Sequence, residues 1–265
     1  MKINYKKIIS LFFCMSFCHL PFLNADIYEG AGIFEKHSLD FRFFDQFLPY
    51  NPVVLEVGAF RGEGVLTAAK LRPKARIIAF EADPYALREL EKNVEEARLT
   101  NVEIHSLAVT SYNGFSLFNL CLGPNGNEPA YGCASSTLPL EKGMEIYCKG
   151  PQIMVPCVNL DSWCKENRIE KIDVLRLEVE GAEFSVLKSS PNTLKNARMI
   201  HVQTQTHPHR LGTVGYPAIK EFLEKNNFVL VSHKCQPEII GHAIFFKREL
   251  FDAYFKQCLG LYLEN

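Results

Sequence analysis

The sequence predicts an α/β fold: a seven-stranded, mostly parallel sheet with helices on both faces and an antiparallel last pair. Two observations predict it. Short apolar runs alternate with amphipathic stretches, which is the strand–helix order of a parallel sheet with right-handed crossovers. The 265 residues, 47% hydrophobic and 22% charged, are typical of a globular protein and favour one large domain.

The first three strands and the two helices between them have the clearest signals. Val53–Val57 and Arg76–Phe80 are apolar runs that predict buried strands. A helix is expected over Gly62–Leu71, which ends before a proline. The helix expected over Pro84–Leu99 has a proline in its first turn and one apolar face. Asn101–Val109 completes the order as a third strand.

The middle of the chain, Thr110 to Gly150, is less regular. Phe115–Leu120 predicts a strand, Gly123–Gly126 a turn and Gly132–Lys149 a loop. Regular structure is then expected to resume with a helix over Leu160–Asn167.

The last third again alternates between strands and helices. Strands are expected over Ile172–Glu178 and Met199–Gln205, and a helix over Ala182–Asn196 that its internal proline must bend or split. A helix over Pro217–Asn226 leads to the antiparallel pair, Phe228–Ser232 and His242–Lys247.

The sharpest functional signal is a glycine-rich loop that follows the first strand and opens a helix. It reads Glu56-Val-Gly58-Ala59-Phe-Arg-Gly62-Glu-Gly64. Glycines let the backbone approach a ligand closely, and a helix start offers free N–H groups. A dinucleotide site needs the spacing G-x-G-x-x-G, so the reading as an NAD-dependent oxidoreductase fails. Glu56 suits a cationic cofactor, and we expect it to balance or orient the amino-acid part of S-adenosylmethionine, with Gly58, Ala59 and Gly62 around it.

Two further positions complete the expected cofactor site. Glu81 ends the second strand, where a carboxylate can accept hydrogen bonds from both hydroxyls of a ribose. Ala108 lies near the end of the third strand, where the backbone can meet an adenine ring. These positions join the glycine-rich loop in a single prediction for S-adenosylmethionine.

Five blocks together resemble the FkbM family of methyltransferases in order and spacing. They read LEVGAFRGEGVLT, IIAFEADP, HSLAVTSYNG, VNLDSW and IDVLRLEVEGAEFSVLKSS, and the resemblance runs from about Val53 to Gln205. It implies a class I, Rossmann-like methyltransferase fold, S-adenosylmethionine as cofactor, and usually O-methylation of hydroxyls on sugars or small metabolites. It also implies that Glu56, Gly58 and Gly62, with Glu81, hold the cofactor.

The chain departs from the family pattern at two positions. The family's lysine is Arg176 here, and its aspartate is Glu178. Arginine keeps the charge but does not carry protons, and Glu178 reaches one methylene further. The departure implies an acceptor other than the family's usual substrates, or a loss of activity.

Two carboxylates are the candidates for the chemistry. A hydroxyl acceptor must lose its proton, and in an open α/β sheet the substrate sits beyond the carboxyl ends of the strands. Glu178 is placed there, and we expect it to be the base or to orient the acceptor. Glu180 has two interpretations that the sequence does not separate. It has the same role as Glu178, or it caps the helix that starts near Ala182.

Histidines and serines near this edge have less specific signals. His201, His207 and His209 lie on or after the next strand and could join Glu178 in a divalent-metal site, although exposed loop histidines are the simpler interpretation. The spacing does not demand a metal, and none is assigned. Ser135-Ser136 is expected to be a lid or a solvated turn.

The N-terminus has the order of a secretory signal peptide. Basic residues precede the uncharged stretch Ile8–Leu23, and cleavage is expected after Ala25. The alternatives are an uncleaved anchor and a buried helix. The expected organisation is a signal peptide or N-terminal anchor at 1–25, a lead-in segment at 26–50, a methyltransferase domain at 51–248 and a C-terminal tail at 249–265. The protein is therefore expected to be exported (secreted or periplasmic) or membrane-anchored.

The cysteines are expected to be mostly small buried hydrophobes. Two of the nine lie in the apolar N-terminal stretch, and export would allow some of the others to pair. No C-x-x-C spacing occurs, so zinc is not expected.

Two functions remain open. The first is an S-adenosylmethionine-dependent O-methyltransferase that acts on a small-molecule or glycan acceptor. The alternative is an exported, catalytically inactive methyltransferase fold that serves as a binding or effector protein. The net charge of −1 argues against nucleic acid as a partner. A membrane is expected as a partner only through the N-terminal segment, and the oligomeric state is left open.

Overall fold

The computed structural model describes residues 44–45, 47–129, 134–205, 209–235 and 240–254. The chain divides into two units, Met1–Lys36 and His37–Asn265, and every described residue belongs to the second. The predicted signal peptide or anchor, His207 and the end of the C-terminal tail therefore lie outside the described residues. No helix among those described has the length and apolar character needed to span a bilayer.

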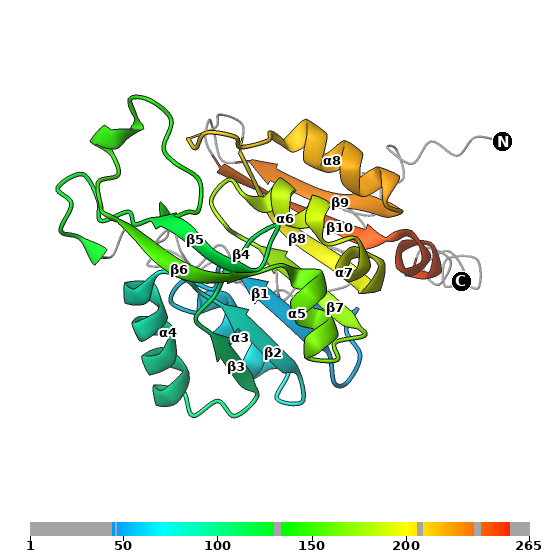
Figure 1. Cartoon of the computed structure of the whole chain (residues 1–265). Coiled ribbons are helices and arrows are strands. Elements are labelled where there is room, and N and C mark those ends of the chain that lie inside the picture. Colours follow the sequence, from blue (N-terminus) through cyan, green and yellow to red (C-terminus); the bar gives the residue numbers. More distant parts are fainter. Residues whose placement is uncertain (1–43, 46, 130–133, 206–208, 236–239, 255–265) are drawn as a thin grey trace, which may run out of the picture. The chain divides into compact units, whose positions relative to one another are not determined.

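The main sheet has seven strands in the order β3-β2-β1-β7-β8-β10-β9 (Figure 1). Only β10 runs antiparallel to its neighbours, which are β8 and β9. The strands are β1 (Val53–Val57), β2 (Arg76–Phe80), β3 (Val102–His105), β7 (Ile172–Leu177), β8 (Ala197–Gln205), β9 (Phe228–Cys235) and β10 (Ile240–Lys247). The seven-stranded, mostly parallel sheet with an antiparallel last pair is thus confirmed.

The single strand expected over Asn101–Val109 is wrong. It is divided into β3 and β4 (Ala108–Val109), and β4 belongs to a second sheet. The amide of Leu107 donates back to the carbonyl of His105 (2.9 Å) and so leaves the ladder between β2 and β3. The apolar run continues across this break, which is why the sequence reads as one strand.

The second sheet has three strands in the order β4-β6-β5. The predicted strand at Phe115–Leu120 is β5 (Gly114–Asn119), whereas β6 (Gln152–Val158) was not predicted. One face of this pair is exposed, and Leu117 lies directly opposite Met154 on it. The loop expected over Gly132–Lys149 holds within its described part, apart from a short 3-10 helix, η4 (Met144–Ile146).

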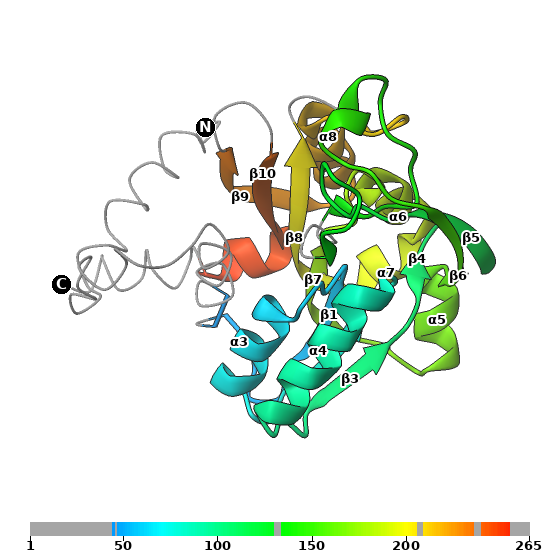
Figure 2. The same cartoon turned by 90° about the vertical axis from the view of Figure 1, so that its left-hand side faces the viewer.

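Helices cover both faces of the main sheet, as expected (Figures 1 and 2). One face carries α3 (Glu63–Leu71) and α4 (Pro84–Glu96), and the other carries α5 (Leu160–Glu166), α6 (Glu183–Ser189), α7 (Pro191–Asn196) and α8 (Tyr216–Lys225). The helix expected over Ala182–Asn196 is split before Pro191, as its proline requires. The helix expected to reach Leu99 ends at Glu96, because Arg98 adopts a left-handed φ of 51°.

A disulfide joins Cys121 to Cys148, with 5.1 Å between the Cα atoms. It ties together the two ends of the segment that leaves β5 and returns to β6. Cys157 and Cys164 are free and buried, as expected for small apolar side chains.

Candidate functional site

The strand register places three ionisable residues side by side on one face of the sheet. Glu56 on β1 is the register partner of Arg176 on β7, which in turn pairs with His201 on β8. All three side chains are buried. Because alternate residues of a strand share a face, Glu178 follows on the same side, just beyond the end of β7.

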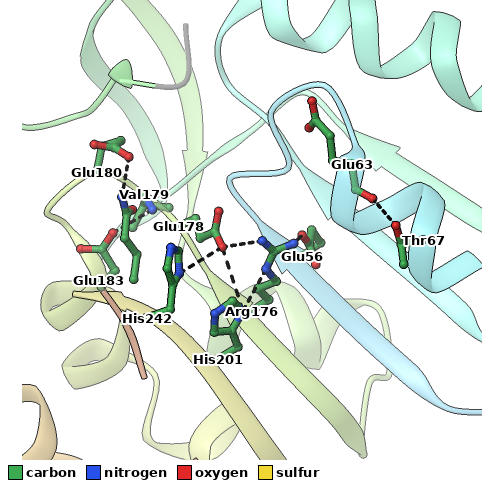
Figure 3. Close-up of polar contacts among 11 residues, drawn as sticks. Glu56, Glu63, Thr67, Arg176, Glu178, Val179, Glu180, Glu183, His201 and His242 are labelled. Atoms are coloured by element: carbon green, nitrogen blue, oxygen red, sulfur yellow. Dashed lines mark hydrogen bonds and ion pairs between the residues drawn. The ribbon is translucent and has the colours of Figure 1, made fainter. Parts of the chain in front are cut away.

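Arg176 lies at the centre of this group (Figure 3). Its guanidinium donates from Nη1 to Glu56 Oε1, from Nη2 to Glu178 Oε1 (2.5 Å) and from Nε to His201 Nδ1 (3.0 Å). A guanidinium presents its donors in a rigid fork, so one side chain can hold three partners at once. The arginine that departs from the family pattern is therefore the residue that links β1, β7 and β8.

Glu56 has its charge compensated within the chain. Burial raises its pKa to about 7, and the neighbouring Arg176 opposes that rise. A buried carboxylate needs such a partner. The expected role of Glu56 in balancing the cofactor stays a prediction, and the structure adds an internal partner that the sequence did not indicate.

Each glycine of the loop makes room for another part of the protein. A Cβ on Gly58 would overlap the carbonyl oxygen of Glu178, and one on Gly64 would overlap the paired side chains of Arg176 and Glu56. Gly62 has a left-handed φ of 90° and packs on Leu90. The loop thus lies directly against the end of β7, which brings the expected cofactor residues next to Glu178.

Glu81 lies beside the same loop at the end of β2. Its carboxylate accepts hydrogen bonds from the backbone amides of Phe60 (2.6 Å) and Asp83 (2.8 Å). Burial raises its pKa to about 7, and these amides oppose the rise. A carboxylate has about four acceptor positions, and the backbone amide of Ala82 also acts on this one, so at least one position remains for a hydroxyl donor.

The two alanines predicted at the cofactor site are both buried. The amide of Ala59 donates to the carbonyl of Phe80 (3.0 Å), and Ala108 pairs with Cys157 in the second sheet. Ala59 is part of the loop. Ala108 lies on a different sheet from Glu81, since β4 has left the ladder of β3.

Two histidines flank Glu178. Its Oε1 lies 3.7 Å from His242 Nδ1 and 4.0 Å from His201 Nδ1. Among the described residues these three form the one group whose ligand atoms lie within 4.8 Å of one another. Arg176 already donates to two of the three side chains, so a divalent ion here would lie beside a guanidinium cation. The donor set therefore does not demand a metal.

Glu180 and Glu183 differ in what they hold. Glu183 accepts from the amides of Val179 (2.9 Å) and Gly181, whereas Glu180 accepts from Nε2 of Gln203 (2.7 Å). The helix that follows has no side-chain cap, so the capping role considered for Glu180 is not seen. Burial raises the pKa of Glu180 to about 7 and that of Glu183 to about 8.

Ser135 and Ser136 are buried, so they are not a solvated turn. Ser135 Oγ donates to Asp83 Oδ2 (2.7 Å), next to Glu81. Ser136 Oγ donates to the carbonyl of Glu180 (3.0 Å). The two serines therefore attach the middle segment to both the predicted cofactor side and the predicted acceptor side of the sheet edge.

Sequence reasoning missed His242 and Gln203. His242 is the register partner of Gln203, on the strand pair that closes the sheet. Each lies two positions along its own strand from a buried apolar or ionisable residue on the same face. That local pattern is only a weak indication of a functional site. His209 was considered for the site, and its amide donates to Gln205 Oε1 (3.4 Å), but it is not part of the group around Glu178.

Comparison with known proteins identifies the family of the chain. A family model of the methyltransferase FkbM domain matches residues 56–230. The chain is 28% identical over 177 residues to the 2-O-methyltransferase NoeI of Sinorhizobium fredii (strain NBRC 101917 / NGR234), which covers 65% of this chain and 71% of that protein. It is also 28% identical over 177 residues to the methyltransferase sdnD of Sordaria araneosa, covering 60% and 68%.

Solved structures with a similar chain course include the following two. One is precorrin-6y C5,15-methyltransferase from Geobacter metallireducens GS-15, with a TM-score of 0.46, 13% identity and coverage of 80% of this chain and 88% of that one. The other is the N-terminal domain of EvdMO1 in the presence of SAH and D-fucose, with a TM-score of 0.47, 12% identity and coverage of 92% and 97%. Both scores are low, and the fold follows from the strand order above.

Proposed function

We propose that this chain, which belongs to the FkbM family of S-adenosylmethionine-dependent methyltransferases, methylates a hydroxyl group of a sugar or small metabolite. The family match makes it a methyltransferase. The name of one relative, a 2-O-methyltransferase, supports oxygen as the acceptor atom, at 28% identity. The observation that carries the proposal is the position of Glu178 just beyond β7: Arg176 holds its carboxylate, and its backbone carbonyl packs against Gly58 of the loop expected to bind the cofactor.

The residues present fit the cofactor. The carboxylate of Glu81 has acceptor capacity beyond its backbone donors, which suits the hydroxyls of a ribose. The loop from Gly58 to Gly62 lies beside it, and the amide of Phe60 already connects the two. When bound, S-adenosylmethionine supplies a methyl group activated by a positively charged sulfur.

The chain's own residues then act on the acceptor. Glu178 takes the proton of the hydroxyl as that oxygen attacks, which is general base catalysis. Arg176 holds Glu178 by its Oε1 and so fixes the position of the carboxylate that accepts the proton. Ser135 and Ser136 attach the middle segment to Asp83 and to the carbonyl of Glu180, beside this edge.

The first test measures cofactor binding by calorimetry on the full chain. Glu81→Ala should weaken binding of S-adenosylmethionine at least tenfold, whereas the matched change Glu103→Ala, on the exposed part of the neighbouring strand, should leave it unchanged. Absence of binding to the folded wild type would refute the proposed function. It would also favour the alternative, a catalytically inactive methyltransferase fold that serves as a binding or effector protein. The comparisons do not support that alternative.

The second test concerns the base. With a hydroxyl acceptor found by screening, Glu178→Gln should lower kcat about 10²- to 10⁴-fold and leave the affinity for S-adenosylmethionine within about twofold. An unchanged kcat would remove Glu178 from this role.

We also propose that the protein works outside the reducing cytoplasm. The N-terminal charge and hydrophobicity pattern and the disulfide between Cys121 and Cys148 support this. Fractionation of cells that express the full chain, with sequencing of the mature N-terminus, tests it. A first residue of Asp26 in an exported fraction is the expected result, and a reduced, uncleaved cytoplasmic protein would refute it.

A further inference from the structure

Strand β8 changes character along its length. Its first half is apolar, but the second half carries His201, Gln203, Thr204 and Gln205, each at most 4% exposed. A central strand with buried amides is costly unless those amides are hydrogen-bonded. The amides of Gln203 and Gln205 are only half satisfied.

The orientation of both amides is fixed by what they bind. In its ionised form the carboxylate of Glu180 only accepts, so Gln203 turns its Nε2 to Glu180. A backbone amide only donates, so Gln205 must turn its Oε1 to His209. Oε1 of Gln203 and Nε2 of Gln205 then have no partner among the described residues, although both are buried.

The two unpaired atoms lie in the part of the molecule where an acceptor is expected. Arg176 and His201 are register partners on neighbouring strands. Glu178 lies two positions after Arg176, and Gln203 lies two positions after His201, so both face the same side of the sheet. Gln203 is also the partner of His242, which flanks Glu178. Gln205 lies one step further toward the carboxyl end.

The backbone of Glu180 shows that this arrangement is imposed. Glu180 has a φ of 51°, a left-handed conformation that is unfavourable for a residue other than glycine. The conformation is held by Ser136, which donates to the carbonyl of Glu180. In this backbone conformation the Glu180 side chain reaches Gln203. Glu180 thereby binds Nε2 of the Gln203 side-chain amide and leaves its Oε1 without a partner among the described residues.

We propose that Gln203 and Gln205 form the acceptor-recognition site, each binding one hydroxyl of a polyhydroxylated ring whose further hydroxyl is methylated. This inference rests on the proposed function. Oε1 of Gln203 accepts from one hydroxyl, and Nε2 of Gln205 donates to another. Successive same-face residues of a strand are about 7 Å apart, so two separate hydroxyls are required and an isolated alcohol or phenol does not satisfy both.

The experiment measures sugar binding to the full chain, apart from methyl transfer. The probes are the methyl glycosides of glucose, galactose, mannose and fucose with their monodeoxy analogues, titrated by saturation-transfer NMR in the presence of S-adenosylhomocysteine. The variants are Gln203→Met and Gln205→Met. Gln152→Met, an exposed glutamine on β6, is the matched control.

Each site variant should raise the Kd of the best glycoside about tenfold, the effect of one lost hydrogen bond, with cofactor affinity unchanged. Each should also become insensitive to removal of one particular hydroxyl that the wild type and Gln152→Met still require. That coupling between one side chain and one hydroxyl is not expected from a merely structural role.

Three outcomes separate this inference from the proposed function. If glycosides bind with the expected coupling but no methyl is transferred, the recognition site stands and the proposed function fails. If a hydroxyl compound is methylated equally well by both variants and the wild type, the proposed function stands and the recognition site is refuted. Failure of every glycoside to bind the folded wild type also refutes the recognition site.

Discussion

Gly64→Ala should destabilise the protein, although alanine is the better helix former. Gly64 is buried near the start of α3, and an added Cβ would overlap Arg176 Nη1 and Glu56 Oε1. The guanidinium cannot move away freely, since its other nitrogens hold Glu178 and His201. The substitution therefore breaks a buried ion pair.

The magnitude follows from two opposing effects. Replacing glycine by alanine within a helix stabilises it by about 1 kcal/mol. Breaking a buried ion pair costs about 3–5 kcal/mol, and both partners here have side chains at most 10% exposed. The net loss in the free energy of unfolding is therefore about 2–4 kcal/mol.

Urea unfolding followed by tryptophan fluorescence measures this loss. Trp163 is the single tryptophan and is buried in the core, so its emission reports the folded state. The same substitution in an Arg176→Met background is the control, because the main obstacle to the new methyl group is then absent. There Gly64→Ala should cost less than about 0.5 kcal/mol.

The reasoning is refuted by either of two results. One is a Gly64→Ala protein as stable as the wild type. The other is an equal cost in both backgrounds, which would place the strain elsewhere than at the ion pair.

Three further predictions concern stability. Reduction of the Cys121–Cys148 disulfide, which closes a sequence separation of 27, should lower the free energy of urea unfolding by about 3–4 kcal/mol. The pKa values of Glu180 and Glu183, raised from 4.5 to about 7 and about 8, mean that the folded state binds protons more tightly than the unfolded chain. Their contribution to stability is therefore complete below about pH 4.5 and is lost as the pH rises through the folded values of about 7 and about 8, so the urea midpoint should fall between about pH 4.5 and pH 8. Gln205→Met removes a buried Nε2 donor that has no partner among the described residues, at the cost of the long hydrogen bond that its Oε1 accepts from the His209 amide (3.4 Å), and should raise the thermal midpoint by the equivalent of about 1 kcal/mol.

Each of these has a control and a contrary outcome. A Cys121→Ser, Cys148→Ser double variant should be insensitive to reductant, and equal stability of the wild type before and after reduction would contradict the first prediction. Glu183→Gln should flatten the fall of stability with pH, and a wild-type midpoint that rises with pH would contradict the second. A loss of stability in Gln205→Met would contradict the third, because the hydrogen bond from His209 would then outweigh the unpaired Nε2.

Local pattern was sufficient for elements bounded by clear signals. Val53–Val57 and Arg76–Phe80 were placed to the residue, since each is an apolar run between a proline or polar turn and a loop. It was not sufficient for β6, which alternates exposed and buried residues beside an exposed strand and contains Pro156. A proline argues against a strand when only the local sequence is read.

The candidate site divides in the same way. The choice of Glu178 as a candidate is predictable from the sequence, because it directly follows an apolar run that predicts a strand. The role of Arg176 as the link between three strands does not, because it depends on which residues of β1 and β8 lie opposite it. The register between strands that are far apart in the sequence is set by the packing of the whole sheet. It cannot be predicted from the spacing of residues along one strand.

The row formed by Glu56, Arg176 and His201 also bears on how faithfully the sheet assembles. Parallel strands with continuous apolar runs can be displaced by two residues and still bury the same face. Here such a displacement of β7 would move its guanidinium away from Glu56 and leave charges unpaired in the interior, a penalty of several kcal/mol against a total stability of only about 5–15 kcal/mol. The charged row therefore favours the correct register, because a sheet with β7 displaced is less stable. The same contacts position the carboxylate of Glu178.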